Sequence, residues 1–105
     1  MKALAVVALS TLVLAGCAST ETDAPWTHWT CDNQTQVFWR LADASGDAVD
    51  LRLGSDSQVR RLLNEPAADG ALYSDGQLSF HAKGQRGLVY WTASDDLIGL
   101  DCKAR

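Results

Sequence analysis

Asp69 and Lys83 are the two residues whose chemistry and surroundings most suggest a binding site. One carries a carboxylate and the other an ammonium group, and each is followed directly by a glycine, Gly70 and Gly84. Charged groups of this kind form strong hydrogen bonds with a partner, and glycine lets the backbone approach it closely. The two side chains are also suited to form a surface ion pair with each other. In that case they would stabilise the fold and would not form a binding site.

A β-hairpin is predicted to bring these residues together. Asp75-Gly76 is typical of a two-residue turn, because a type I′ turn needs positive φ at both central positions. With this turn at the tip, Ala71 faces Phe80 and Asp69 faces Ala82. Lys83 then lies diagonally beside Asp69 at one edge of a sheet, while His81 points to the polar face and is expected to be solvated.

The hairpin resembles a motif of the membrane-bound and periplasmic inhibitors of C-type lysozyme. That family carries S-G-x-x-Y and, further along, K-G. This chain has Asp69-Gly70-Ala71-Leu72-Tyr73 and then Lys83-Gly84, so Asp69 stands where the family has serine. The resemblance extends to Cys31, to Cys102 and to a lipoprotein leader.

The resemblance implies an eight-stranded antiparallel barrel that blocks the active-site cleft of a C-type lysozyme, without cofactor or turnover. It implies a lysozyme-binding site made of Asp69, Gly70, Tyr73, Lys83 and Gly84. The cleft holds a protonated acid and an ionised carboxylate, so Lys83 is expected to pair with the carboxylate. Asp69 can accept a hydrogen bond from the acid, but its charge repels the carboxylate. Tyr73 is expected to pack inward and support the loop.

Two other functions compete with inhibition. A lipoprotein on the same scaffold would bind another envelope protein or a glycan, and four tryptophans are available for a carbohydrate platform: Trp26, Trp29, Trp39 and Trp91. A small-ligand carrier would need a hollow barrel, whereas Leu51, Tyr73 and Phe80 are expected to fill it.

Residues for catalysis or metal binding do not cluster in the sequence. His28 and His81 lie in different predicted strands with no motif around either. A metal site needs three or four converging ligands, and Asp95-Asp96 is more typical of a solvated turn. The sequence therefore predicts neither an enzyme, nor a metal site, nor a cofactor.

The charge balance argues against nucleic acid as a partner. The chain has 9 Lys and Arg against 13 Asp and Glu, a net charge of −4. Without Lys2 in the leader, 8 basic residues face 13 acidic ones, a net charge of −5. Phosphate binding needs a basic surface, whereas an acidic protein attracts a basic partner. C-type lysozymes, the partner that the resemblance implies, are typically basic.

The N-terminal segment is expected to export and anchor the chain. Ala3–Ala15 is an apolar run with the length of a signal-peptide core, too short to span a bilayer. Leu14-Ala15-Gly16-Cys17 is similar to a lipobox, which predicts removal of residues 1–16 and acylation of Cys17 with lipid such as palmitate. The alternative is an ordinary secretory signal. Residues 17–25 are then the lipidated cysteine and a flexible polar tether, and Ala18 favours the outer membrane, with the domain facing the periplasm.

Residues 26–105 are expected to form one domain that needs a covalent staple. A core of this size is near the lower limit for independent stability. Export to an oxidising compartment favours a disulfide between Cys31 and Cys102, the cysteines that remain. Metal ligation or a reactive thiol is the alternative, but no C-x-x-C or clustered histidine accompanies either cysteine.

The domain is predicted to be all-β, a small antiparallel barrel of about eight strands closed by one disulfide. Short runs with alternating polarity and frequent turns are typical of such a barrel. In Leu97–Lys103, Ile98, Leu100 and Cys102 are expected to share one face. The segment Gln58–Leu63 is the least regular, and a short helix is the alternative there. The expected strands are Thr27–Cys31, Gln36–Leu41, Ala48–Leu53, Gln58–Leu63, the hairpin Ala71–Lys83, Leu88–Thr92 and Leu97–Lys103.

Overall fold

The computed structural model describes residues 24–54 and 56–105. The predicted leader (1–16), the lipidation site Cys17 and most of the tether (18–23) lie outside these residues. Within the described part the chain is all-β and contains no helix.

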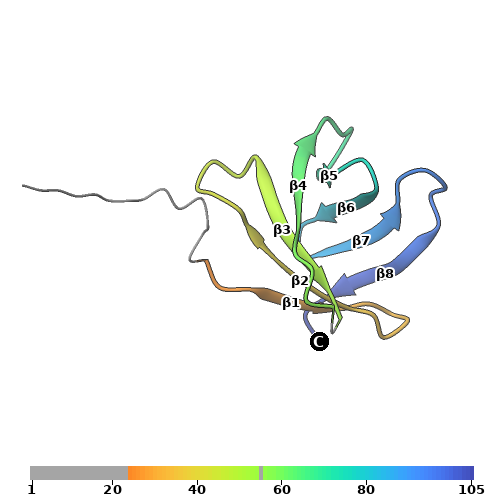
Figure 1. Ribbon diagram of the computed structural model, residues 1–105. Helices are drawn as coiled ribbons and strands as arrows, with labels where there is room; N and C mark the ends of the chain where they lie inside the picture. The colour runs from red at the N-terminus through yellow and green to blue at the C-terminus, as the bar shows by residue number, and fades with distance from the viewer. Residues whose placement is uncertain (1–23, 55) are drawn as a thin grey trace, which may run out of the picture.

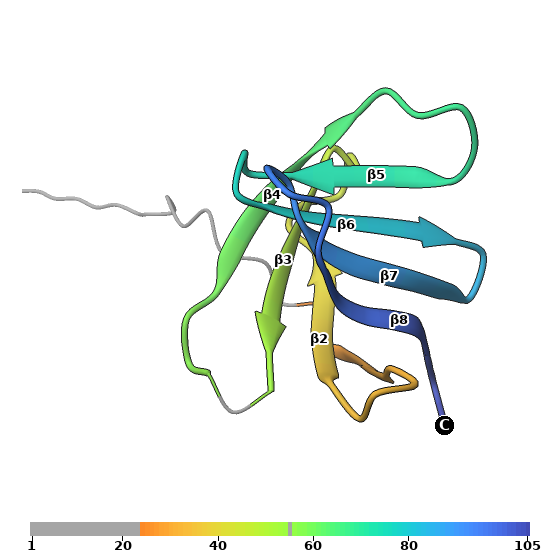
Figure 2. The same cartoon turned by 90° about the vertical axis from the view of Figure 1, so that its right-hand side faces the viewer.

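Eight antiparallel strands close into a barrel in which each strand pairs with its neighbours in sequence and β8 pairs with β1 (Figure 1). Figure 2 shows β5 to β8 running side by side along one wall. The predicted fold class is confirmed. The strands are β1 (Thr27–Thr30), β2 (Gln36–Leu41), β3 (Ala48–Leu53), β4 (Arg60–Glu65), β5 (Ala71–Ser74), β6 (Leu78–Lys83), β7 (Arg86–Trp91) and β8 (Leu97–Lys103).

Inward-pointing side chains fill the barrel. Phe80 lies at the centre of an aromatic group, with ring centroids 5.9 Å from Trp29, 5.7 Å from Trp39 and 6.4 Å from Tyr73. Aromatic rings at such separations add to the stabilisation from buried area. The fully buried aliphatic side chains around them are Val37, Val49, Leu51, Leu62, Leu78 and Val89.

The seam between β1 and β8 is where the barrel closes. Its ladder contains one residue pair, Thr30 with Lys103. Directly beside this pair, Cys31 and Cys102 form the predicted disulfide, with both residues buried. The disulfide therefore joins the first and last strands of the barrel at the point where the ladder between them is limited to this one residue pair.

The register of the β5–β6 hairpin differs from the prediction by two residues. Tyr73 pairs with Phe80, and Ala71 pairs with Ala82. The cause is Asp75, which lies before the tip instead of within it: its Oδ1 accepts hydrogen bonds from the backbone N–H groups of Gln77 (2.9 Å) and Leu78 (2.8 Å). A shift of two residues keeps every side chain on its predicted face.

Two further predictions are wrong in detail. The irregular segment is a strand, and it runs from Arg60 to Glu65 instead of from Gln58 to Leu63. Leu100 is exposed, because the pairing of β7 with β8 shifts between Gly87 and Val89 and again between Val89 and Tyr90, which interrupts the alternation of faces in the middle of β8.

Candidate functional site

One end of the barrel, here called the mouth, gathers the residues that the sequence singled out. It is the end at which β2, β4 and β6 finish and β3, β5 and β7 begin, so it carries the loops 42–47 and 66–70 and the turn 84–85. Asp69, Gly70, Lys83 and Gly84 therefore converge here from two separate connections. The connections 31–35, 75–77 and 92–96 lie at the opposite end, together with residues 54 and 56–59.

Asp69 and Lys83 form an ion pair at the mouth. The distance from Lys83 Nζ to Asp69 Oδ2 is 3.0 Å, and the two side chains are 60% and 63% exposed. The hydrogen bond from Lys83, followed by its charge, lowers the pKa of the Asp69 carboxyl below its usual 3.8. The pair that sequence analysis kept as a structural alternative is thus present, and both groups remain accessible to a partner.

Gly70 is required by both its backbone and its surroundings. Its φ is +67°, and a Cβ atom there would lie 2.5 Å from the Ala82 carbonyl oxygen and 2.6 Å from Lys83 Cγ. His81 fixes the preceding residue, because its Nε2 donates a hydrogen bond to the Asp69 carbonyl oxygen (2.9 Å). His81 is expected to be solvated, and in the structure it is half-buried and has this additional role. Its imidazole holds the loop that carries Asp69.

Tyr73 packs inward, as predicted. Its ring lies against Phe80, and its hydroxyl donates a hydrogen bond to the Gly46 carbonyl oxygen (3.3 Å) in the neighbouring mouth loop. Gly84 begins the two-residue turn after Lys83 with φ +65° and has open space where a Cβ would stand. Tyr73 thus braces the mouth from inside, while Gly84 shapes its outer edge.

Two neighbouring hollows open at the mouth, and Trp39 and Gly84 line both of them. Three of the predicted site residues, Gly70, Tyr73 and Gly84, line a hollow of about 330 Å³. The other hollow, of about 520 Å³, is lined by Thr27, Trp29, Trp39, Gly84, Gln85, Arg86, Lys103 and Ala104. We call the larger one the indole hollow.

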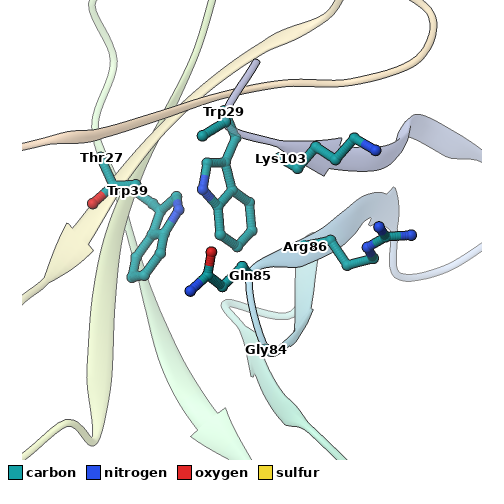
Figure 3. A pocket seen from close by; sticks show the side chains of 8 residues that line it. Thr27, Trp29, Trp39, Gly84, Gln85, Arg86 and Lys103 are labelled. Carbon is teal, nitrogen blue, oxygen red and sulfur yellow. The ribbon is translucent and has the colours of Figure 1, made fainter.

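Figure 3 shows how the side chains lie around the indole hollow. The indoles of Trp29 and Trp39 stand edge to face, with centroids 5.2 Å apart. The Gln85 carboxamide turns toward Trp39, whereas Arg86 and Lys103 extend away from both indoles. Sequence analysis named both tryptophans but not Gln85, because no motif relates a turn residue to indoles on β1 and β2.

Among the described residues, no group of three or more His, Cys, Asp or Glu side chains could hold a metal ion. The same part of the chain has no helix long and apolar enough to cross a membrane. What the mouth offers is a charged rim around partly apolar hollows, an arrangement suited to binding.

A disulfide-closed barrel with such a mouth defines a small binding protein. The chain belongs to the family described as membrane-bound lysozyme-inhibitor of c-type lysozyme, whose model matches residues 29–98. Comparison with curated proteins and with solved structures found no match. Membership of this family gives inhibition of lysozyme as the general function, c-type lysozyme as the partner and association with the cell envelope.

Proposed function

We propose that this chain inhibits C-type lysozyme by inserting the mouth rim, Asp69–Tyr73 together with Lys83-Gly84, into the active-site cleft. The observation that supports this most is the convergence of both motif segments on one protruding edge, with Lys83 Nζ exposed beside Asp69. Inhibition of this kind blocks the cleft stoichiometrically and uses no catalytic residue.

Lys83 would provide the main electrostatic contact. The cleft of a C-type lysozyme holds an ionised carboxylate next to a protonated acid. Insertion replaces the exposed Asp69–Lys83 pair by a pair between Lys83 and that carboxylate in a drier environment. Exposed ion pairs contribute little, whereas desolvation strengthens a charge pair that keeps good geometry, so the exchange favours the complex.

Asp69 would limit the affinity. Its carboxylate is ionised at neutral pH, and Lys83 lowers its pKa further below the usual 3.8. In the complex it would approach the ionised carboxylate of the enzyme. Like charges in a desolvated interface cost several kcal/mol. The protonated acid of lysozyme offsets part of this cost by donating a hydrogen bond to Asp69.

The envelope location would follow from the N-terminal segment. We propose that residues 1–16 are a lipoprotein signal peptide, that Cys17 carries the lipid (palmitate among its acyl chains), and that residues 17–25 tether the domain 26–105. Ala18 favours the outer membrane, facing the periplasm. Metabolic labelling with palmitate tests this directly: wild type should take up label and Cys17→Ser should not, and label in Cys17→Ser would contradict it.

Lysis of a peptidoglycan suspension by C-type lysozyme tests the inhibitory mechanism, with increasing amounts of the full chain added. Wild type should inhibit, and Lys83→Ala should raise the inhibition constant at least tenfold, about 1.4 kcal/mol. Asp69→Ser should lower the constant by removing the repulsive charge. Arg60→Gln is the matched control, because it also removes one cation but lies beside Asp75 at the opposite end.

Three outcomes separate the alternatives. Loss of inhibition in Arg60→Gln equal to that in Lys83→Ala would mean that net charge, not the rim, carries the effect. Inhibition only by Asp69→Ser would mean that the scaffold persists while lysozyme is no longer its target. If no variant inhibits, the alternative of an envelope lipoprotein that binds another protein or a glycan takes over.

A further inference from the structure

We propose that the indole hollow is a second binding site, and that it takes the acetamido group of an N-acetylated amino sugar. This site goes beyond lysozyme inhibition, since Asp69, Gly70, Tyr73 and Lys83 do not line it and it shares only Gly84 with the proposed rim. Its volume of about 520 Å³ falls within the range of roughly 300–1,000 Å³ typical of small-molecule sites.

The first observation is an unused hydrogen-bond donor. The indole nitrogen of Trp39, Nε1, is buried and has no hydrogen-bond partner among the residues that the structure describes. Buried indole N–H groups usually find an acceptor. In Figure 3 this nitrogen lies on the edge of the ring that faces Trp29 and Gln85, so an acceptor that entered the indole hollow would meet it.

The second observation is the composition of the wall around that donor. The Gln85 carboxamide, which both donates and accepts hydrogen bonds, is turned into the same space. Thr27 also lines the hollow, but its hydroxyl points away from the indoles. The two indoles supply apolar surface. Because Arg86 and Lys103 extend away from the indoles and pair with Asp101 (3.2 and 3.7 Å), the interior favours a neutral ligand.

An acetamido sugar matches these groups one by one. Its carbonyl oxygen would accept from Trp39 Nε1–H, and its amide N–H would donate to the Gln85 side-chain oxygen. Its methyl group and the C–H face of the pyranose ring would pack on the indoles. A sugar without the acetamido group would leave the Trp39 donor unpaired, and sites built on hydrogen bonds reject such analogues strongly.

The test is a titration of the ¹⁵N-labelled full chain followed by NMR, in which every tryptophan indole N–H gives its own signal. The probe is N,N′-diacetylchitobiose, and cellobiose is the matched control because it lacks the acetamido groups. Saturable shifts are expected for the Trp39 indole and the Gln85 amide. Trp91, 42% exposed at the far end of β7, should not respond, and cellobiose should bind at least tenfold more weakly.

Two variants make the assignment specific. Trp39→Phe keeps an aromatic ring but removes the donor, and Gln85→Ala removes the carboxamide from an exposed turn. Each should weaken the binding of diacetylchitobiose at least tenfold, judged from backbone amides around residues 84–87. The signals of Trp91 and of the backbone amides of β3, which lie outside the hollow, report that the fold is intact. The proposal is overturned if the Trp39 indole does not move, if Trp91 moves equally, or if cellobiose binds as well.

Discussion

At the mouth of the barrel, the ion pair between Asp69 and Lys83 decides what Lys83 can offer a partner. The sequence predicted this pair even though the predicted register was wrong by two residues. In the predicted alignment Asp69 faces the residue before Lys83, and in the structure Lys83 lies opposite Gly70, which follows Asp69. The two residues are thus diagonal neighbours in either register.

Gly70→Ala should be far more damaging than the matched change Gly84→Ala. Both glycines have positive φ, +67° and +65°, but only at Gly70 would a Cβ collide with backbone and with Lys83. The left-handed conformation alone costs about 1–2 kcal/mol, which is the loss expected for Gly84→Ala. Overpacking should bring the loss in Gly70→Ala to about 3 kcal/mol or more.

Urea denaturation of both variants measures these losses. Equal losses in the two variants would show that the space around Gly70 is less restricted than described. A larger loss in Gly84→Ala would contradict the geometry of the mouth altogether.

Other residues of the mouth were beyond the reach of sequence reasoning. His81 holds the Asp69 carbonyl oxygen, and Gln85 faces the Trp39 indole, but neither belongs to a motif. Both contacts depend on the curvature of the closed barrel, which brings side chains from strands distant in sequence to one rim. The periodicity of the sequence predicts which face of a strand a side chain occupies, but not which residue it contacts across the mouth.

At the scale of elements, the β5–β6 turn shows why turn chemistry gave the hairpin but not its register. Asp-Gly predicted a hairpin correctly. The Asp75 side chain, however, accepts from two backbone N–H groups and so belongs before the central pair, Gly76-Gln77. A side chain that replaces a backbone acceptor changes the alignment without changing the element.

The pKa of Asp75 makes this turn sensitive to acid. Partial burial, the largest single effect, raises the pKa, but hydrogen bonds from Leu78 and Gln77 together with Arg60 bring it below 3.8. The native state therefore binds this proton more weakly than the unfolded state. Its contribution to stability is complete above the unfolded pKa and is lost as pH falls through the folded value.

Asp75→Asn should retain the hydrogen bonds of the turn but not this titration. At neutral pH wild type should be the more stable of the two in urea, and the difference should shrink below pH 3.8. A difference that stays constant across this range would contradict the assigned role of the Asp75 carboxylate.

Asp50 on β3 shows that the alternation of polar and apolar residues does not always predict burial. The alternating polarity of Ala48–Leu53 predicts that this side chain faces outward. It is nevertheless only 3% exposed, because Arg40 and Arg61 from the adjacent strands cover it. Removing one partner of a buried charge pair leaves the others uncompensated. Asp50→Asn should therefore lower the free energy of unfolding by about 2 kcal/mol, discounted for the partial exposure of Arg61.

Asp101→Asn is the comparison for Asp50→Asn, because the pairs of Asp101 with Arg86 and Lys103 are more exposed. Its expected loss is about 0.5–1 kcal/mol. Thermal unfolding of the two variants checks both values. Equal losses of unfolding free energy in the two variants would mean that the buried pairs of Asp50 stabilise the barrel no more than the exposed pairs of Asp101.

At the scale of the whole molecule, closure of the barrel depends on the seam between β1 and β8. The sequence predicted the closed all-β fold and the disulfide. Short alternating strands are compatible with few other folds, and once the leader is set aside only two cysteines remain to pair. It did not show that the seam has a single residue pair beside the bond. The disulfide thus supports the weakest ladder of the barrel.

Replacing both cysteines by serine should lower the free energy of unfolding by about 4 kcal/mol, the chain-entropy value for a loop of this length. Hydrogen exchange should accelerate first in β1 and β8. Uniform acceleration through all strands would contradict a weak seam and would indicate a single cooperative unit.

Carboxylates lie at both ends of the molecule. The end opposite the mouth carries Asp32, Asp56, Asp75, Asp95 and Asp96 in its connections, and the mouth carries Asp43, Asp47 and Asp69 in its loops beside the cations Lys83 and Arg86. The net charge of −4 can attract a basic enzyme over a distance, while contact is left to the mouth.

Hydrogen exchange of the full chain with and without C-type lysozyme tests the central claim most directly, because it shows which end of the barrel the enzyme covers. Insertion of the mouth rim predicts protection in residues 66–73 and 81–87 and no change in the turn 92–96. Protection confined to the turns of the opposite end, with the mouth unchanged, would contradict insertion of the rim into the cleft.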